Sequence, residues 1–257
     1  MTPRKALHLA HAEQYASSRA EWRRKSGFLH REDETYLRFL IPEGARVLEI
    51  GCGIGDTLAA LKPSFGVGVD FSPAMVAQAR TRHPDLTFIV GDAEDSATLD
   101  ALQGPFDYIL VLDTIGELDD CQAFFALLHR LCRRETRLVI GYFSHLWYPI
   151  LKFAEAIGQR MPYPEQNVLS PADVMGLAKL ADFDPVKAEQ RVLMPVSVFG
   201  LGRIVNRFIS ILPGIRALAL RHYVVCRSER VAVDDLRSAS VVIPARNERG
   251  NIAPAVE

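Results

Sequence analysis

Short apolar runs rich in β-branched residues recur along the chain, and stretches with helical spacing separate them. Runs of this length predict strands, and apolar positions repeating with the helical period predict amphipathic helices. Ser72-Pro73, Asp120 and Ser170-Pro171 each offer an N-capping side chain where a helix is expected to begin. Strand and helix in succession predict a parallel sheet covered on both faces. The predicted strands are 46–50, 66–70, 88–92, 106–113, 137–142, 185–193 and 223–226.

The region before Arg46 is polar, with aromatic side chains set among charges at helical spacing. This pattern predicts a helical cap over residues 1–45. Its cations either meet an anionic acceptor or form a solvated helix face, and the sequence leaves both interpretations open. The cations concerned are Arg19, Arg23, Arg24, Lys25, His30 and Arg31.

The segment Val196 to Leu220 is apolar and precedes the last predicted strand. Its apolar positions follow helical spacing while arginines fall on another face, which predicts an amphipathic helix inserted before that strand. Between Arg191 and Arg230 there are seven arginines and one acid, Glu229. Such a helix either lies on an anionic bilayer surface, at about 1 kcal/mol per basic residue, or packs on its own domain.

Composition sets limits on class and compartment. The chain has 257 residues, 49% hydrophobic, with a formal net charge of −1, so it can bury a substantial core and is not an obvious nucleic-acid binder. It shows neither a signal-peptide pattern nor an apolar stretch long enough to span a membrane. Its cysteines lack metal or disulfide spacing and are expected to be reduced thiols, which predicts a cytoplasmic protein, with the membrane's cytoplasmic face as one location.

The most informative motif lies at residues 46–56, which read RVLEIGCGIGD. An apolar strand here breaks into alternate glycines, and glycine allows a tight turn and close approach of a ligand to the backbone. Carboxylates follow at Asp70 and Asp92. The dinucleotide-binding fingerprint shares this start, but it places its third glycine at position 56, where this chain has Asp. The spacing therefore favours another kind of nucleoside cofactor.

The pattern Glu49-x-Gly51-x-Gly53-x-Gly55 resembles motif I of class I S-adenosylmethionine-dependent methyltransferases. Segments 66–75, 88–94 and 106–113 resemble the next three strands of that family, so the resemblance covers about residues 46–142. It implies that Glu49 takes the ammonium group of S-adenosylmethionine, Asp70 the ribose hydroxyls and Asp92 the adenine amine. It also implies that Phe71, Met75, Ala93 and Leu112 enclose the adenine. The complete predicted cofactor set is Glu49, Gly51, Cys52, Gly53, Gly55, Asp70, Phe71, Met75, Asp92, Ala93, Glu94 and Leu112.

The same resemblance implies an α/β fold, a Rossmann-like doubly wound sheet that is mostly parallel with an antiparallel last strand. The methyltransferase domain is expected to span residues 1–230. Within it, 46–143 form the cofactor-binding half and 144–230 the substrate side. Residues 231–257 are then a linker and the start of a further domain.

A catalytic base is needed only when the methyl acceptor is a hydroxyl, because amines and carboxylates are nucleophilic in a common form. The candidates follow the fourth and fifth strands: Asp113, Glu117 and His145, with Tyr142 and Tyr148 nearby. His145 is the first choice and Asp113 the second, and the alternative for His145, which the sequence favours, is a histidine that is only packed or solvated. No metal site is predicted.

Residues 240–252, SVVIPARNERGNI, resemble the opening strand and loop of family 2 glycosyltransferases. This resemblance implies that a glycosyltransferase domain is covalently linked after residue 257 and that residues 240–257 are its truncated start. The predicted function is therefore methyl transfer to a small-molecule or lipid-linked sugar acceptor, as half of a bifunctional protein. Two alternatives stay open: a non-catalytic cofactor-binding module that regulates the partner domain, and, more remotely, a nicotinamide oxidoreductase.

Overall fold

The computed structural model describes residues 1–197, 199–210, 212 and 214–231. The predicted glycosyltransferase start at 240–257 lies outside these residues, and so does nearly all of the predicted linker. Both stay predictions, as does the domain boundary at residue 230.

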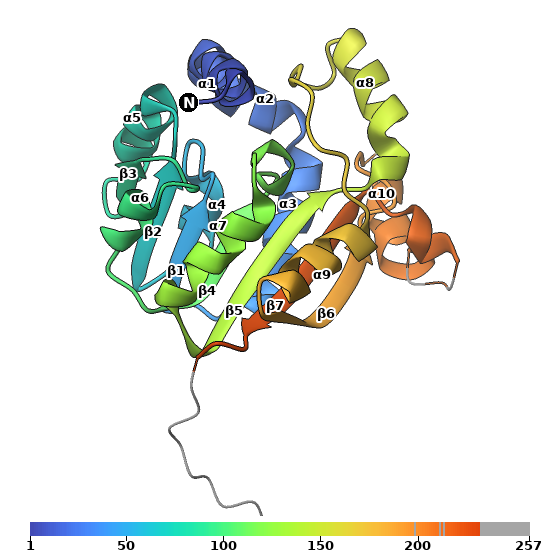
Figure 1. The fold of residues 1–257 in the computed structure, drawn as a ribbon. Coiled ribbons are helices and arrows are strands. Elements are labelled where there is room, and N and C mark those ends of the chain that lie inside the picture. The colour runs from blue at the N-terminus through green and yellow to red at the C-terminus, as the bar shows by residue number, and fades with distance from the viewer. Residues whose placement is uncertain (198, 211, 213, 232–257) are drawn as a thin grey trace, which may run out of the picture.

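A seven-stranded sheet runs through the centre of the molecule in the order β3-β2-β1-β4-β5-β7-β6 (Figure 1). β7 pairs antiparallel with both β5 and β6, and the other pairs are parallel. The fold prediction, including the antiparallel last strand, is confirmed. The strands are β1 Arg46–Ile50, β2 Phe65–Asp70, β3 Thr87–Val90, β4 Phe106–Leu112, β5 Cys132–Phe143, β6 Phe183–Arg191 and β7 Arg221–Ser228.

Helices cover both faces of the sheet because successive strand residues point to opposite sides. One face carries Leu48 and Ile109, which pack with the helices α6 (Ser96–Asp100), α7 (Cys121–Leu128) and α9 (Pro171–Leu180). The other carries Val47 and Leu110, which pack with α3 (Gly27–Leu40), α4 (Asp56–Ala60) and α5 (Pro73–Arg82). Both faces are buried, as expected for near-continuous apolar strands.

The predicted helix starts are confirmed. The side chain of Ser72 accepts a hydrogen bond from the backbone N–H of Met75, and that of Asp120 accepts one from Ala123. Ser170 and Asp173 form a reciprocal capping box at the start of α9. These bonds satisfy N–H groups that have no partner inside the helix.

The predicted cap is also helical. It consists of α1 (Pro3–Tyr15), the short turn η1 (Ala16–Ser18), α2 (Arg19–Lys25) and α3. These helices reach the upper edge of the sheet, where the parallel strands end (Figure 1). Glu13 ties α1 to α5, since its carboxylate accepts hydrogen bonds from Ser72 Oγ at 2.6 Å and from Ala74 N at 3.0 Å.

Arg221 at the start of β7 joins the cap to the sheet. It is 1% exposed, and its guanidinium pairs with Asp33 of α3 and with Asp113, which directly follows β4. Tyr223 Oη donates to the same Asp33 carboxylate at 2.5 Å. A buried charge is tolerated only when its partners are in place, so these groups depend on one another.

The helical insertion predicted between β6 and β7 is present, but its helix is shorter than the predicted segment. α10 (Leu201–Ile204) continues directly into a π-helical turn η5 (Val205–Ile209), and a separate 3-10 turn η6 (Ile215–Leu218) follows. Gly200 and Gly214 precede α10 and η6 with positive φ angles of 79° and 84°, which a regular helix cannot accommodate. The sequence also missed helix α8 (Tyr148–Ala156), which follows the turn η4 (His145–Trp147).

None of the described helices combines the length and the apolar composition that crossing a bilayer requires.

Arg221→Gln is expected to lower the free energy of unfolding by about 3 kcal/mol, because the buried carboxylate of Asp33 would lose its cationic partner. Arg227→Gln on the same strand is the matched control, since Arg227 pairs with Asp184 on the surface and such pairs contribute at most about 1 kcal/mol. Urea unfolding of both variants measures the difference. Equal losses would contradict the anchoring role of Arg221.

Candidate cofactor and acceptor site

The glycine loop after β1 adopts a conformation that few other residues could take. Gly51, Gly53 and Gly55 have φ angles of 72°, 52° and 78°. The loop is held to the neighbouring strand because Gly51 N donates to Val69 O at 2.8 Å. A Cβ atom on Gly51 would lie 2.0 Å from Thr114 Oγ1, so this position has no room for a side chain. Position 51 therefore accepts glycine alone unless Thr114 moves.

Asp70 at the tip of β2 fixes this loop from the side. Its Oδ2 accepts a hydrogen bond from Gly53 N at 2.8 Å, and its Oδ1 accepts one from Ser72 N at 2.9 Å. Burial raises the pKa of Asp70, and the two N–H donors oppose that shift. The carboxylate is thus held rigidly at the edge of a cavity, with further lone pairs available to a ligand.

A cavity opens where β1, β2 and β3 end, and we call it the strand-tip cavity. Six residues of the predicted cofactor set line it together: Gly51, Asp70, Phe71, Asp92, Ala93 and Glu94. Glu117, one of the candidate bases, also lines it, and the sequence predicted no role for the remaining lining residues, Lys5, His8, Ile50, Val69, Gly91, Thr114 and Leu118. The cavity thus brings together strand tips that are distant along the chain.

Three residues of the predicted cofactor set do not line this cavity, and their contact with the cofactor stays a prediction. Cys52 and Leu112 pack in the core on the α3 side of the sheet. Met75 packs under the cap with Ala16 and Ile54. Gly53 and Gly55 do not line the cavity either, and Gly53 N is already bound to Asp70.

Glu49 lies beneath the loop and is 3% exposed. Its carboxyl group accepts a hydrogen bond from the backbone of Leu58, while Oε2 has no partner among the described residues. Burial raises the pKa of Glu49 to about 8. An unpartnered buried carboxyl oxygen is costly unless a donor reaches it, so Glu49 fits the ammonium group that the sequence assigned to it.

Lys5 of α1 reaches into the strand-tip cavity and holds two of the predicted acids. Its Nζ lies 2.6 Å from Asp92 Oδ2 and 2.8 Å from Glu94 Oε2. Glu94 also accepts hydrogen bonds from the backbone of Asp119 and Asp120 at 3.1 and 2.6 Å. Glu94 therefore positions the segment before α7, while Asp92 is held by Lys5 and by the backbone N–H of Glu94, which donates to its Oδ1 at 2.9 Å.

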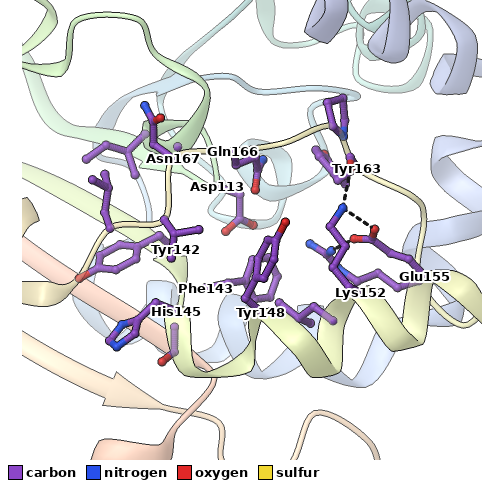
Figure 2. Close-up of a pocket in the computed structure, with 18 residues that line it drawn as sticks. Asp113, Tyr142, Phe143, His145, Tyr148, Lys152, Glu155, Tyr163, Gln166 and Asn167 are labelled. Carbon is purple, nitrogen blue, oxygen red and sulfur yellow. Dashed lines mark hydrogen bonds and ion pairs between the residues drawn. The ribbon is translucent and has the colours of Figure 1, made fainter. Parts of the chain in front are cut away.

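A second cavity lies beside the first, and we call it the aromatic cavity (Figure 2). Its rings come from Tyr142, Phe143, Tyr148 and Tyr163, and Asp113 lies near its centre. Gln166 and Asn167 add amide groups to its wall. The cavity offers flat apolar surfaces together with a few hydrogen-bonding groups, as small-molecule sites do.

The two predicted catalytic residues differ in position. Asp113 faces the aromatic cavity, paired with Arg221. His145 is exposed at its edge, and Figure 2 shows its ring turned away from Asp113. The start of η4 directs the chain outward at this point, because Ser144 caps the turn and fixes its orientation. The geometry therefore argues against His145 as the base.

Glu117 joins the two cavities. The segment from Asp113 to Leu118 lies between the cavities: Asp113, Ile115 and Gly116 line the aromatic cavity, and Thr114, Glu117 and Leu118 line the strand-tip cavity. Its Oε1 accepts a hydrogen bond from Gln166 Nε2 at 3.0 Å, and Gln166 belongs to the aromatic cavity. Burial raises the pKa of Glu117 to about 7. This value suits a group that exchanges protons near neutral pH.

Within the described part of the chain, no three His, Cys, Asp or Glu side chains are grouped so that they could hold a metal ion.

Comparison with known proteins adds family evidence to this geometry. Residues 47–135 match a family described as a methyltransferase domain. The demethylmenaquinone methyltransferase of Beutenbergia cavernae is 30% identical over 156 residues, which are 53% of this chain and 63% of that protein. The dTDP-3-amino-3,4,6-trideoxy-alpha-D-glucopyranose N,N-dimethyltransferase of Streptomyces venezuelae is 33% identical over 95 residues, or 35% of this chain and 40% of that protein.

A solved structure shares the fold. It is an S-adenosylmethionine-dependent methyltransferase from Thermotoga maritima, described as a possible histamine N-methyltransferase. The TM-score is 0.67 at 20% sequence identity, and the match covers 86% of this chain and 100% of that one.

Fold and cavity together define a Rossmann-like protein with a cavity at its strand tips, the place where folds of this kind bind nucleoside cofactors. The family match and the relatives support a methyltransferase domain at residues 47–135, which implies S-adenosylmethionine as the cofactor, and the solved structure shares the fold.

Gly51→Ala is expected to abolish detectable binding of S-adenosylmethionine, because the new methyl group would collide with Thr114. Gly158→Ala is the matched control: its φ is 70°, and a Cβ there would meet nothing within 4 Å. Both variants share the backbone strain of about 1–2 kcal/mol, and only Gly51→Ala adds the collision. Titration calorimetry measures binding, and unchanged affinity in Gly51→Ala would contradict the tight approach at this loop.

Proposed function

We propose that this chain is an active S-adenosylmethionine-dependent methyltransferase whose acceptor occupies the aromatic cavity. The adjacency of the two cavities carries the proposal, because methyl transfer requires both reactants at one place more than it requires acid or base. The family match and the shared fold support methyltransferase activity.

The residues present fit the cofactor in charge and shape. Bound S-adenosylmethionine supplies an electrophilic methyl group on a sulfonium centre. Asp70 is proposed to take the ribose hydroxyls and Asp92 the adenine amine, with Phe71 and Leu118 as apolar walls. Glu49, with its unpartnered oxygen, is proposed to receive the ammonium group.

Arg19 of the cap is proposed to receive the cofactor's carboxylate. It lies over the ring of Tyr163, and the charges of Asp113 and Glu117 act on it from the two cavities. Arg23 is excluded from this role, because it is held by Glu34 at 2.9 Å and by Asp56 at 3.4 Å.

The acceptor is proposed to be a neutral, hydroxylated ring. Lys152 and Arg160, the cations of the aromatic cavity, both pair with Glu155, so they leave little positive charge for an anion. The rings, the amides of Gln166 and Asn167, and Asp113 instead suit a sugar. The Streptomyces venezuelae relative is also named for a sugar, although that sugar carries an amine.

The resemblance of residues 240–252 to glycosyltransferases supports the same class of acceptor. We therefore propose that the acceptor is a free or lipid-linked sugar, and that the methyltransferase is covalently linked to a glycosyltransferase domain.

Glu117 is proposed as the base when the acceptor is a hydroxyl. Glu117 lines the strand-tip cavity and is hydrogen-bonded to Gln166, which lines the aromatic cavity. Among the residues that the structure describes, His145 has no such link between the two cavities. In its ionised form the carboxylate accepts the hydroxyl proton as the methyl group is transferred.

The function is tested with S-adenosylmethionine labelled at the methyl group, incubated with the protein and nucleotide sugars or lipid-linked sugars. The expected result is label in the sugar and formation of S-adenosylhomocysteine. Cofactor binding with no labelled product from any of these acceptors or from a cell extract would contradict enzymatic activity and favour a regulatory binding module.

Asp70→Ala is expected to weaken S-adenosylmethionine binding by at least about tenfold, because charge-assisted hydrogen bonds to the ribose would be lost. Asp184→Ala, which removes a surface carboxylate paired with Arg227, should leave the affinity unchanged. Titration calorimetry compares the two. Equal affinities would mean that the ribose does not lie at Asp70.

Glu117→Gln is expected to remove the rise in turnover with increasing pH through about 7, since only the ionised carboxylate accepts a proton. Stability gives a second readout. Burial raises the folded pKa above its usual value, so ionisation of Glu117 destabilises the native chain as the pH rises from about 4.5 to 7. The Glu117→Gln variant should therefore be more stable than the native chain at pH 8 but no more stable than the native chain at pH 4.

The exposed Glu21 supplies the control, because Glu21→Gln should change neither the pH profile of turnover nor the stability difference. A native pH profile in Glu117→Gln would exclude this residue as the base.

A further inference from the structure

Exposed apolar side chains gather on α8 and on the insertion between β6 and β7. On α8 they follow one helical stripe, Ile150, Phe153 and Ile157, exposed by 53%, 65% and 54%. On the insertion, Phe199 stands fully clear of the protein at 104%. We call this combined surface the apolar shelf, and its members are Leu146, Ile150, Phe153, Ile157, Val196, Phe199, Leu201, Ile204, Phe208, Ile209, Leu212 and Leu218.

The two parts of the shelf are joined at their base. Trp147, at the start of α8, donates a hydrogen bond from Nε1 to Leu218 O of η6 at 2.8 Å. Trp147 and Leu151 also pack against buried Val192 and Leu220, the residues that flank the insertion. Figure 1 shows α8 and α10 at the same side of the molecule, beyond the β6 edge of the sheet. The exposed side chains therefore belong to one region.

Charge distinguishes this region from an ordinary apolar patch. Residues 192–220 contain three arginines, Arg203, Arg207 and Arg216, and no acid. All three are exposed. The other arginines counted in the sequence are engaged elsewhere: Arg191 with Glu189, Arg221 in the core, and the remaining two with acids of the β6 region.

Arg203 and Arg207 directly precede Ile204 and Phe208, and the Arg207 guanidinium lies 5.5 Å from the centre of the Phe208 ring. A long cationic side chain beside a protruding apolar one is the arrangement found at membrane interfaces, where the stem is buried and the charge reaches the headgroups.

We propose that the apolar shelf seats this protein on the surface of an anionic lipid bilayer. The bilayer accepts protruding side chains such as Phe199 without a complementary groove, and its negative surface potential attracts the three arginines. A patch of this extent is unusual on a monomer unless it binds something.

The shelf also flanks the aromatic cavity. Leu151, Lys152 and Glu155 line the cavity from the opposite side of α8 to the exposed stripe. If the proposed function holds, this places an acceptor carried by a lipid within reach of the cavity while its anchor stays in the bilayer.

Vesicle sedimentation tests this membrane binding. The full chain is used without cofactor or acceptor, so that a failure to bind vesicles is independent of methyl transfer. The native protein should bind vesicles of equal parts phosphatidylglycerol and phosphatidylcholine, and added salt should weaken binding. The double variant Phe199→Glu/Phe208→Glu should bind at least about tenfold more weakly, and so should Phe153→Glu/Ile157→Glu.

Arg203→Gln and Arg207→Gln should each weaken binding to the anionic vesicles by about fivefold and leave binding to pure phosphatidylcholine unchanged. Leu180→Glu is the matched control, because Leu180 is 66% exposed on α9, outside the shelf, and its replacement should have no effect. Titration with S-adenosylmethionine shows that each variant is folded.

Three results would overturn the proposal: no binding of the native protein to anionic vesicles, an equal loss in Leu180→Glu, or a dimer in solution that the shelf variants convert to monomer. The last would assign the shelf to a second copy of the chain.

Discussion

The hydrogen bonds that Asp70 accepts from Gly53 and Ser72 are the constraint on which the site depends. They connect the loop after β1 to the tip of β2 and hold that loop in a left-handed conformation that glycine adopts without strain. Once the loop is fixed, the backbone of Gly51, the carboxylate of Asp70 and the acid of β3 face one cavity. A parallel sheet presents its carboxyl ends at one edge, so a single turn geometry gathers residues from distant parts of the chain.

The sequence predicted this part well because the signals are local. Alternating glycines, acids at strand ends and N-capping serines each report their own backbone conformation, and the corresponding strands and helix starts were found. Whether Leu112 and Met75 line the cavity could not be predicted, because their orientation depends on which face of a strand or helix is turned toward it. The insertion helix is shorter than the predicted segment, because the backbone at Gly200 and Gly214 has positive φ angles that a helix does not continue through.

The contacts made by the cap could not be predicted from the sequence for a different reason. Lys5 meets Asp92, and Arg221 meets Asp33, across separations of 87 and 188 residues that no local pattern encodes. These long-range pairs place the cap across the strand-tip cavity and bring Arg19 toward it. The same packing moves the candidate base from His145 to Glu117, whose link to Gln166 exists only in the folded chain.

The most direct test of the account is a crystal structure of the protein grown with S-adenosylhomocysteine. The predicted result places the ribose hydroxyls at Asp70, the adenine between Phe71 and Leu118, and the ammonium group at Glu49, with Lys5 displaced from Asp92. A ligand bound away from the strand tips, or a loop at Gly51 that does not touch it, would contradict the central claim.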